Sequence, residues 1–431
     1  MSFPVRDRGD AAISTSPDEL PSTTSGPTST LAGPAEPDSD AGDHGPAAIA
    51  ELAKEAGLTN VHMLAWRDLD DVEAGGSEIH AANVAKLWAE AGLNVTMRAS
   101  YAQGQPPRAI RDGCQVIRRG GRFGVFPHAI LSELSERHGP NDGLVEIWNG
   151  VPFLSPIWFH KPRVVVIHHV HRKMWDMVLD EKMAKFGRLL EGTLAPPFYR
   201  RTQIVTPSYS SREEITTLLG LPDKNITVAF PGIDPRFVPG VPKADHPLLV
   251  SCGRLMPPKK FDEMMRIAAE VRKTHPDLEL VIVGDGYERP KLQQLAADLG
   301  AQDWIRLAGR VSDEELVWLY QRAWALTSAS TAEGWGMTIT EAAACGTPAV
   351  CTRIAGHRDS VAENQSGLLG DSSRDMVEKI NLLLADAELR TKLSEGALKR
   401  AAEFTWARCA YDTFAPLARD ALRRRHGRKG I

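Results

Sequence analysis

The chain has 431 residues, of which 42% are apolar and 25% charged, a composition typical of globular proteins and unlike a coiled coil, a collagen or a membrane bundle. Its 51 basic and 55 acidic residues leave a formal charge of −4, which does not favour nucleic acid as a partner. The length exceeds what one hydrophobic core usually supports, so we expect two domains.

The charge is unevenly distributed along the chain. Residues 1–50 carry −6 and are rich in Pro, Ser, Thr and Gly, whereas residues 419–431 carry +5. A segment with almost no large apolar side chain cannot offset the entropy lost on folding. We therefore predict that residues 1–50 form a disordered tail outside the fold.

Neither the cysteines nor the apolar runs indicate export. The five cysteines are widely spaced and form no Cys-x-x-Cys pair, which is typical of a reducing compartment without a disulfide framework or a structural metal. We find no secretory signal pattern and no apolar run of spanning length. The sequence thus predicts a cytoplasmic protein.

From about residue 60, strand-like apolar runs alternate with amphipathic helical stretches such as Glu78–Ala91. This alternation predicts α/β architecture with doubly wound parallel sheets. A Pro/Gly cluster over 231–242 predicts a linker, so we place one domain at 51–240 and a second at 241–403, with helical stretches after it. The predicted strands are Val61–Ala65, Leu93–Met97, Val145–Trp148, Val164–Ile167, Ile204–Thr206, Leu248–Cys252, Leu280–Val283, Ile305–Ala308, Ala325–Thr327 and Ala349–Cys351.

The most informative motif places Glu333 and Glu341 eight positions apart, after a predicted strand and into a predicted helix. The glycines between them, Gly334 and Gly336, let backbone amides approach a ligand closely, and a helix N-terminus attracts anions. The pattern favours a phosphate site flanked by two carboxylates that bind sugar hydroxyls. For either glutamate alone, a helix-capping or solvated role is the simpler interpretation.

Two further loops follow strands of the second domain. The first carries Arg254 and Lys259, a bidentate donor and a point charge suited to a diphosphate. Its position at the carboxyl end of a strand is where open α/β sheets bind ligands. The second, Val283–Gly286, has only two glycines, and the chain contains neither Gly-x-Gly-x-x-Gly nor a Gly-Lys-Ser/Thr loop, which disfavours dinucleotide and P-loop enzymes.

In the first domain, Gly75 and Gly76 lie between a strand and its helix, where their amides could face an anion. His168, His169 and His171 follow a buried strand. Three histidines at one strand end are unlike core residues, but no carboxylate at helical spacing completes a metal site. We therefore predict no bound metal.

These motifs, in this order over roughly residues 60–415, resemble the retaining nucleotide-sugar glycosyltransferases of family 4. The resemblance implies the GT-B fold, two facing Rossmann-like domains, with C-terminal helices that cross back to the first domain, here at 404–424, and a basic tail at 425–431. Departures from the family pattern include Trp335 in place of Phe, Lys260 in place of Gly, and His169 after His168, so either histidine could face the cleft.

The resemblance also implies a role for each candidate residue. The diphosphate would be held by Gly75, Gly76, Arg254 and Lys259, the ribose by Glu341, and the base near Arg310 and Val311. The catalytic residues beside the donor sugar would be His168 and Glu333, with backbone amides at Gly334, Trp335, Gly336, Met337 and Thr338.

The expected function is front-face transfer of a hexose, with retention, from a nucleoside diphosphate sugar to a glycan, lipid or small-molecule acceptor, without a cofactor or metal. A nucleotide-sugar epimerase, a phosphorylase or a non-catalytic sugar-nucleotide-binding protein are the alternatives. The +5 C-terminus predicts peripheral contact with anionic lipid at the inner face of the membrane, although a solvated tail is the favoured interpretation of the two.

Overall fold

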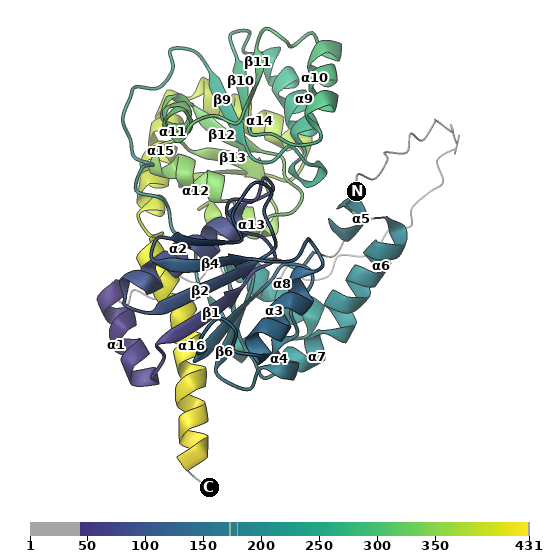
Figure 1. Ribbon diagram of the computed structural model, residues 1–431. Helices are drawn as coiled ribbons and strands as arrows, with labels where there is room; N and C mark the ends of the chain where they lie inside the picture. The colour runs from purple at the N-terminus through teal and green to yellow at the C-terminus, as the bar shows by residue number, and fades with distance from the viewer. Residues whose placement is uncertain (1–43, 172–173, 179, 430–431) are drawn as a thin grey trace, which may run out of the picture. The chain divides into compact units, whose positions relative to one another are not determined.

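The computed structural model describes residues 44–171, 174–178 and 180–429. It contains two α/β halves, each built on its own sheet with helices on both faces, and both belong to one compact unit (Figure 1). Most of the predicted tail, residues 1–43, lies outside the described residues. Its predicted end at residue 50 is wrong, because helix α1 already begins at Pro46 and buries Ile49.

The first sheet has eight strands in the order β3-β4-β2-β1-β5-β6-β7-β8. All neighbours are parallel except β3, which pairs antiparallel with β4. The strands are β1 Asn60–Leu64, β2 Asn94–Ala99, β3 Arg108–Arg111, β4 Cys114–Arg118, β5 Gly143–Trp148, β6 Arg163–Ile167, β7 Gln203–Thr206 and β8 Ile226–Val228.

The second sheet is parallel throughout, with six strands in the order β11-β10-β9-β12-β13-β14. In both sheets the strand order reverses direction along the chain, which is the doubly wound arrangement that the alternating pattern predicts. The strands are β9 Leu248–Cys252, β10 Glu279–Val283, β11 Ile305–Gly309, β12 Ala325–Ser328, β13 Ala349–Thr352 and β14 Gly367–Gly370.

Helices cover the sheets and connect their strands. In the first half they are α1 Pro46–Ala56, α2 Gly76–Glu90, α3 Val125–Leu134, α4 Ser155–Trp158, α5 Met174–Val178, α6 Glu181–Leu189, the π-helix η1 Leu190–Leu194, α7 Pro196–Tyr199, α8 Tyr209–Leu219 and the 3-10 helix η2 Asp223–Asn225. In the second half they are the 3-10 helix η3 Pro257–Lys259, α9 Phe261–Arg272, α10 Arg289–Asp298, α11 Asp313–Arg322, α12 Met337–Ala344, α13 Ala355–Ser360, α14 Ser373–Ala385 and α15 Ala387–Ala401, followed by α16 Trp406–Lys429.

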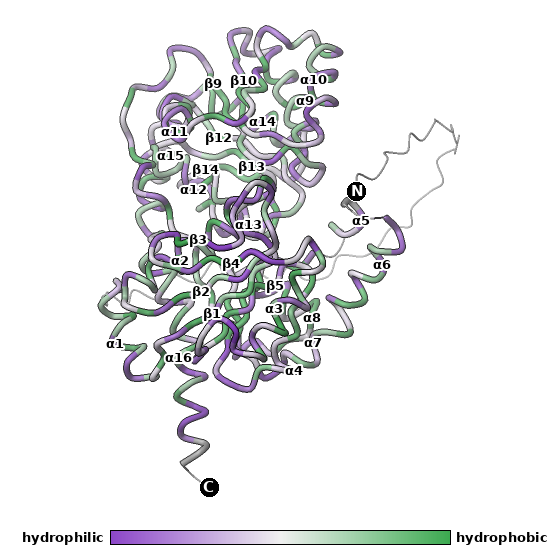
Figure 2. Tube along the Cα trace, viewed as in Figure 1, coloured by the Kyte–Doolittle hydropathy of each residue, from purple (hydrophilic) through white to green (hydrophobic). Residues whose placement is uncertain are grey.

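The central strands are nearly continuous apolar runs because helices cover both of their faces. Val164, Val165 and Val166 of β6 and Leu280 and Ile282 of β10 are at most 2% exposed. Figure 2 shows hydrophobic residues along the strands and hydrophilic residues in many of the outer loops. Each half therefore has its own hydrophobic core.

Every strand predicted from the sequence is present, with ends shifted by at most two residues. The strands β3, β4, β8 and β14 were missed, and the antiparallel β3 corrects the expectation of a purely parallel first sheet. The turn between β3 and β4 consists of Asp112 and Gly113, both with positive φ. Asp-Gly is a strong hairpin signal, so the sequence did contain the information for this pair.

The last helix crosses back to the first half, as the family resemblance implies. The chain passes between the halves twice, and the two connections contact each other where the Ile233 amide donates to the Phe404 carbonyl. Helix α16 then packs against α1, α2 and strands β5 to β8 of the first half. The Trp88 indole of α2 donates to the Ala410 carbonyl at 3.0 Å, and its ring meets Phe414 edge-on at 5.3 Å.

The arginines at the end of α16 have partners in the protein. Arg423 and Arg424 pair with Asp420, which is 2% exposed. The Arg424 guanidinium also donates to the His160 carbonyl, and that of Arg425 to the Glu55 carbonyl. The helix continues to Lys429, so the predicted basic tail at 425–431 is helical over most of its length and its first arginine anchors the helix to the first half.

Replacing Phe414 with Ala tests the contribution of α16 to the first half. The side chain is fully buried, so we expect the free energy of unfolding to fall by about 3–5 kcal/mol in urea denaturation. Leu382→Ala is a matched control, because that side chain is 52% exposed on α14 and its loss should change the free energy by less than about 0.5 kcal/mol. Equal effects of the two changes would contradict the packing described above.

Candidate functional site

The centre of the candidate site is an ion pair between Lys259 and Glu333. Lys259 ends the short helix η3 after β9, and Glu333 lies in the loop between β12 and α12. The lysine ammonium donates to Glu333 Oε1, which also accepts the Ser330 hydroxyl at 2.9 Å. Burial alone would raise the pKa of Glu333, but Lys259, His357 and these hydrogen bonds hold it below its usual value.

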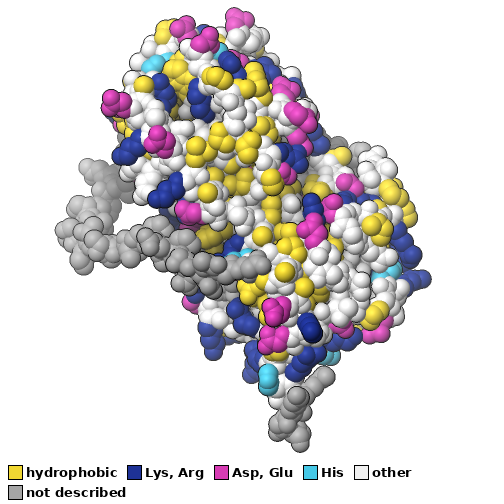
Figure 3. All heavy atoms as spheres, turned by 90° about the vertical axis from the view of Figure 1, so that its left-hand side faces the viewer, with side chains coloured by type: hydrophobic (Ala, Val, Ile, Leu, Met, Phe, Trp, Pro, Cys, Tyr) yellow, Lys and Arg dark blue, Asp and Glu magenta, His cyan; other side chains and the backbone are white. Residues whose placement is uncertain are grey.

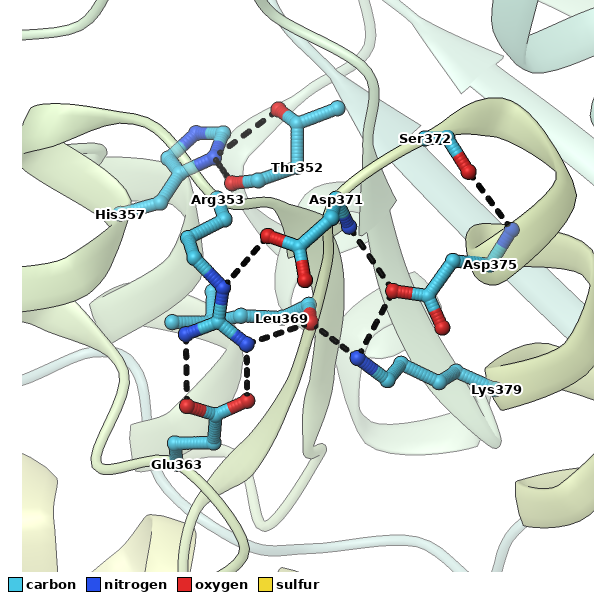
Figure 4. A network of polar contacts seen from close by, with 9 residues as sticks. All are labelled: Thr352, Arg353, His357, Glu363, Leu369, Asp371, Ser372, Asp375 and Lys379. Atoms are coloured by element: carbon cyan, nitrogen blue, oxygen red, sulfur yellow. Dashed lines mark hydrogen bonds and ion pairs between the residues drawn. The ribbon is translucent and has the colours of Figure 1, made fainter. Parts of the chain in front are cut away.

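The segment after β13 supports the loop that carries Glu333. The Gly356 amide donates to the Glu333 carbonyl at 3.1 Å. Figure 4 shows how that segment is fixed: Arg353 binds Glu363 with two nitrogens and Asp371 with a third, and His357 Nδ1 lies 2.9 Å from the Thr352 carbonyl. A bidentate guanidinium–carboxylate pair has a defined geometry, so it fixes the backbone on which the Glu333 loop rests.

Two basic residues of the second half contact the loop between β1 and α2 of the first half. The Arg254 guanidinium donates to the Glu73 carbonyl at 2.7 Å, and that of Arg310 to the Val72 carbonyl at 2.6 Å. A Cβ added at Gly75 would lie 3.3 Å from Arg254 Nη2. The structure thus brings Arg254, Arg310 and the glycine loop together, as expected for groups that share a ligand.

Close backbone packing also joins the histidine segment to the Glu333 loop. A Cβ added at Gly334 would lie 2.4 Å from the His168 carbonyl oxygen, so only glycine fits there. The Ser208 hydroxyl donates to the Gly334 carbonyl at 2.8 Å, and the Ser211 hydroxyl to the His168 carbonyl at 3.1 Å. These serines, at the start of α8, were missed because serine at a helix N-terminus usually signals only a cap.

Helix α12 begins directly after this contact, so its first amides, including those of Met337 and Thr338, open toward the Glu333 loop. Gly336 before it has φ 95°. The side chain of Trp335 is 3% exposed and packs against Phe230 and Phe404. Its side chain therefore belongs to the core beside the site, which leaves only its backbone as a candidate ligand.

Glu341 also belongs to helix α12, and its carboxylate is partly buried. The Tyr320 hydroxyl donates to its Oε2 at 3.4 Å, a long hydrogen bond. Burial raises the pKa of Glu341 to about 7. Without a ligand, this group is therefore only partly ionised near neutral pH.

The histidines after β6 occupy different surroundings. The His168 ring meets His80 of α2 edge-on at 5.0 Å, and the His169 ring stacks on His171 at 4.6 Å. Burial lowers the pKa of His168 well below its usual value and that of His169 to about 3, so both rings are neutral. The charges of Glu333 and Lys259 act on the pKa of His169, whereas burial is the main cause of the lowered pKa of His168.

The turn Val283–Gly286, which the sequence left without a role, supports the site from outside it. A Cβ added at Gly284 would lie 2.0 Å from the Gly253 carbonyl oxygen, and one at Gly286 would lie 2.4 Å from that of Leu255. The glycines therefore let β10 and the Arg254 loop pack closely.

Among the residues that the structure describes, no group of three His, Cys, Asp or Glu side chains could hold a metal ion, and no helix is long and apolar enough to cross a membrane.

Comparison with known families matches two models that meet at the connection between the halves. The model described as Glycosyltransferase Family 4 matches residues 74–237, and the model described as Glycosyl transferases group 1 matches residues 236–400. A D-inositol 3-phosphate glycosyltransferase of Stackebrandtia nassauensis is 33% identical, over 86% of this chain and 93% of that one. One of Corynebacterium urealyticum is 34% identical, over 81% and 92%.

Solved structures with the same fold have much lower identity. A sucrose-phosphate synthase from Thermosynechococcus elongatus gives a TM-score of 0.71 at 18% identity, over 86% of this chain and all of that one. An Anabaena protein, HepE, in complex with UDP and glucose gives 0.62 at 17% identity, over the same shares. These structures support the expected arrangement of two Rossmann-like halves.

The raised pKa of Glu341 predicts a pH-dependent cost to stability. Between its ordinary pKa of 4.5 and about 7, the folded chain holds a proton at this carboxyl that the unfolded chain has released, so stability falls as the pH rises through this range. Glu341→Gln should therefore raise the free energy of unfolding at pH 8 relative to the unchanged protein, and the gain should shrink toward pH 5. A gain of the same size at both pH values, measured by urea denaturation, would show that burial of this charge is not its cause.

Proposed function

Since the chain belongs to the glycosyltransferases of the family 4 type, we propose that it transfers a hexose from a nucleoside diphosphate sugar to an acceptor hydroxyl with retention of configuration. The observation that carries the proposal is the Lys259–Glu333 pair beside Arg254, at the carboxyl ends of the second sheet. Lys259 and Arg254 supply positive charge that can bind a diphosphate, and Glu333 next to Lys259 supplies a carboxylate that can accept hydrogen bonds from sugar hydroxyls.

The diphosphate binds, in this proposal, to Arg254 and Lys259 and to the amides of the glycine loop across from them, where the Gly75 amide exchanges its present acceptor, Glu78 Oε2, and Gly76 follows it. The amides of residues 334–338 complete this surface at the start of α12, where the helix dipole favours negative charge. Arg254 is already in hydrogen-bonding contact with the glycine loop, so a diphosphate there would be held by both halves.

The ribose, the base and the hexose of the donor bind on either side of the diphosphate in this proposal. Glu341 accepts hydrogen bonds from the ribose hydroxyls, and binding favours its ionised form. The base lies against the backbone at Arg310 and Val311. The Arg310 guanidinium donates to the Val72 carbonyl of the first half. His168 and Glu333 lie beside the hexose.

Donor binding requires Lys259 to exchange its partner. In the structure the lysine is paired with Glu333, and the more highly charged diphosphate competes for it. The exchange frees Glu333 Oε1 to accept a hexose hydroxyl instead. The pair therefore keeps both charges satisfied before the donor binds and gives each a substrate partner afterwards.

The transfer step needs no protein nucleophile in this scheme. The bond between the anomeric carbon and the β-phosphate oxygen breaks, and the acceptor oxygen forms its bond on the same face of the sugar. The acceptor proton passes to an oxygen of the departing diphosphate. Arg254 and Lys259 stabilise the charge that develops on that leaving group, and no cofactor or metal takes part.

The comparisons suggest which substrates to test first. The relatives named above are called D-inositol 3-phosphate glycosyltransferases, and structures of the Anabaena protein hold UDP or UDP-glucose. We propose a sugar or polyol acceptor bound by the first half. UDP-glucose and GDP-mannose are the donors to compare, with myo-inositol phosphate as the first acceptor.

The proposed location is the cytoplasm. All five cysteines are free, and four of them are buried, as in a protein that needs no disulfide. Basic side chains are visible near the end of α16 in Figure 3, so peripheral contact with anionic lipid stays a proposal. Its weakness is that Arg423, Arg424 and Arg425 already bind groups of the first half.

Donor binding and turnover should depend on the two cations. Lys259→Ala and Arg254→Ala should each weaken donor binding about 10-fold or more, as expected for the loss of a charge-assisted hydrogen bond, and should lower transfer further. Lys273→Ala is the control, because that lysine is 70% exposed and pairs with Glu270, one turn away on the same surface. Calorimetric titration with each donor measures binding, and radiolabel transfer measures turnover.

Proton NMR of the product tests the stereochemical part. An α-linked donor should give an α-linked product, and a β-linked product would exclude the front-face route. Incubation of the donor without an acceptor separates transfer from epimerisation, which would proceed alone. Equal donor binding by the Lys259, Arg254 and Lys273 variants would overturn the site assignment.

A further inference from the structure

A buried carboxylate near the site has no part in the scheme above. Glu191 lies in the π-helical segment η1 between α6 and α7 and is 3% exposed. Single π-helical turns are rare and occur often at functional sites. A buried carboxylate also needs compensating partners, because burial without them is costly.

Glu191 contacts the segment after β6 through both of its carboxylate oxygens. Its Oε1 accepts the His171 amide at 2.9 Å and lies 3.4 Å from His171 Nδ1, and its Oε2 accepts the Trp175 indole at 2.9 Å. Burial would raise the pKa of Glu191, but these groups hold it below its usual value. The carboxylate is therefore ionised and holds the backbone of His171 by a hydrogen bond, with the ring Nδ1 beside it but not hydrogen-bonded.

The hold on His171 extends to His169. The two imidazoles stack with their centroids 4.6 Å apart and their planes 27° from parallel. The centroid of the Trp175 ring lies 5.3 Å from that of His171, and Trp175 is itself closely packed. A Cβ added at Gly187 would lie 2.7 Å from the Trp175 ring, and one at Gly150 would lie 2.8 Å from it. Neither ring can shift without displacing the other contacts.

His169 in turn lies next to the donor site. A Cβ added at Gly334, the residue after Glu333, would be 3.6 Å from His169 Cβ. Helix α5, which carries Trp175, contacts the turn η3 that ends at Lys259. His169 Nε2 is buried and has no hydrogen-bond partner among the described residues, and a buried polar atom of this kind calls for an explanation.

We propose that Glu191 is a positioning residue for transfer, which fixes His171 and thereby holds His169 in place to hydrogen-bond a hydroxyl of the substrate. The inference rests on the proposed function and adds to it a second histidine and the buried acid that orients it. The sequence left open whether His168 or His169 faces the substrate; both have buried ring nitrogens without a partner among the described residues, and this arrangement adds a contact from His169 to the one proposed for His168.

The test variant is Glu191→Gln. The two donors meet different oxygens of Glu191, and Gln has an NH2 group in place of one of them, so either the His171 amide or the Trp175 indole would face another donor. Donor affinity should stay within about 2-fold, while kcat for transfer should fall about 10- to 100-fold, the range expected for a misplaced contact in the reacting complex. The probes are UDP-glucose and GDP-mannose with myo-inositol phosphate, or a crude acceptor extract.

A double-mutant cycle separates positioning from general destabilisation. If Glu191 acts through His169, then Glu191→Gln should have little further effect on kcat in a His169→Ala background. Glu146→Gln is the matched control, a buried carboxylate of the same half that accepts from the Phe153 amide and the Tyr199 hydroxyl. It should lower the melting temperature, but its effect on kcat per folded molecule should be small and should not depend on His169.

If Glu191→Gln does not fold, Trp175→Phe is the second variant, because it keeps an aromatic ring at this position and removes the indole N–H donor. It should give a smaller loss of kcat that also disappears in the His169→Ala background. Additive effects of these changes with His169→Ala, or unchanged kcat in both variants, would overturn the inference. A wild-type protein that binds neither donor and transfers no sugar would overturn the proposed function instead.

Discussion

The site depends on one electrostatic constraint, the pairing of Lys259 with Glu333 where the loops after β9 and β12 meet. Each side chain is partly buried, so either charge alone would be poorly solvated. The lysine ammonium lowers the pKa of Glu333 against the effect of burial, which keeps the carboxylate in the ionised form that accepts hydrogen bonds from sugar hydroxyls. The packing around them, from Gly356 behind the loop to Ser330 beside the carboxylate, keeps this pair in place.

Close backbone contacts give the site its precision. Gly334 lies against the His168 carbonyl, and Gly284 lies against the Gly253 carbonyl, at distances that exclude any side chain. The first contact joins the histidine segment of the first half to the Glu333 loop, and the second joins neighbouring loops of the second half. Together with the contacts of Arg254 and Arg310 to the β1–α2 loop, they place residues from distant parts of the chain around one position.

Much of this arrangement could be predicted from the sequence, because strands buried on both faces are continuous apolar runs and the charged motifs directly follow them. The sequence could not show that Trp335 packs in a core with Phe230 and Phe404, since burial depends on the partners. Nor could it show the function of Glu191, which is one acid in a helical stretch until folding brings His171 and Trp175 against it. The start of helix α1 was missed because it follows a long Pro/Ser-rich segment and its large apolar side chains are only Ile49 and Leu52, which the packing on α16 makes part of the core.

The most direct test of the central claim is a crystal structure of the full chain with a bound nucleoside diphosphate. The account predicts that the diphosphate contacts Lys259 and Arg254, and that the lysine has left Glu333 Oε1 to do so. A nucleotide bound elsewhere, with the Lys259–Glu333 pair unchanged, would contradict it.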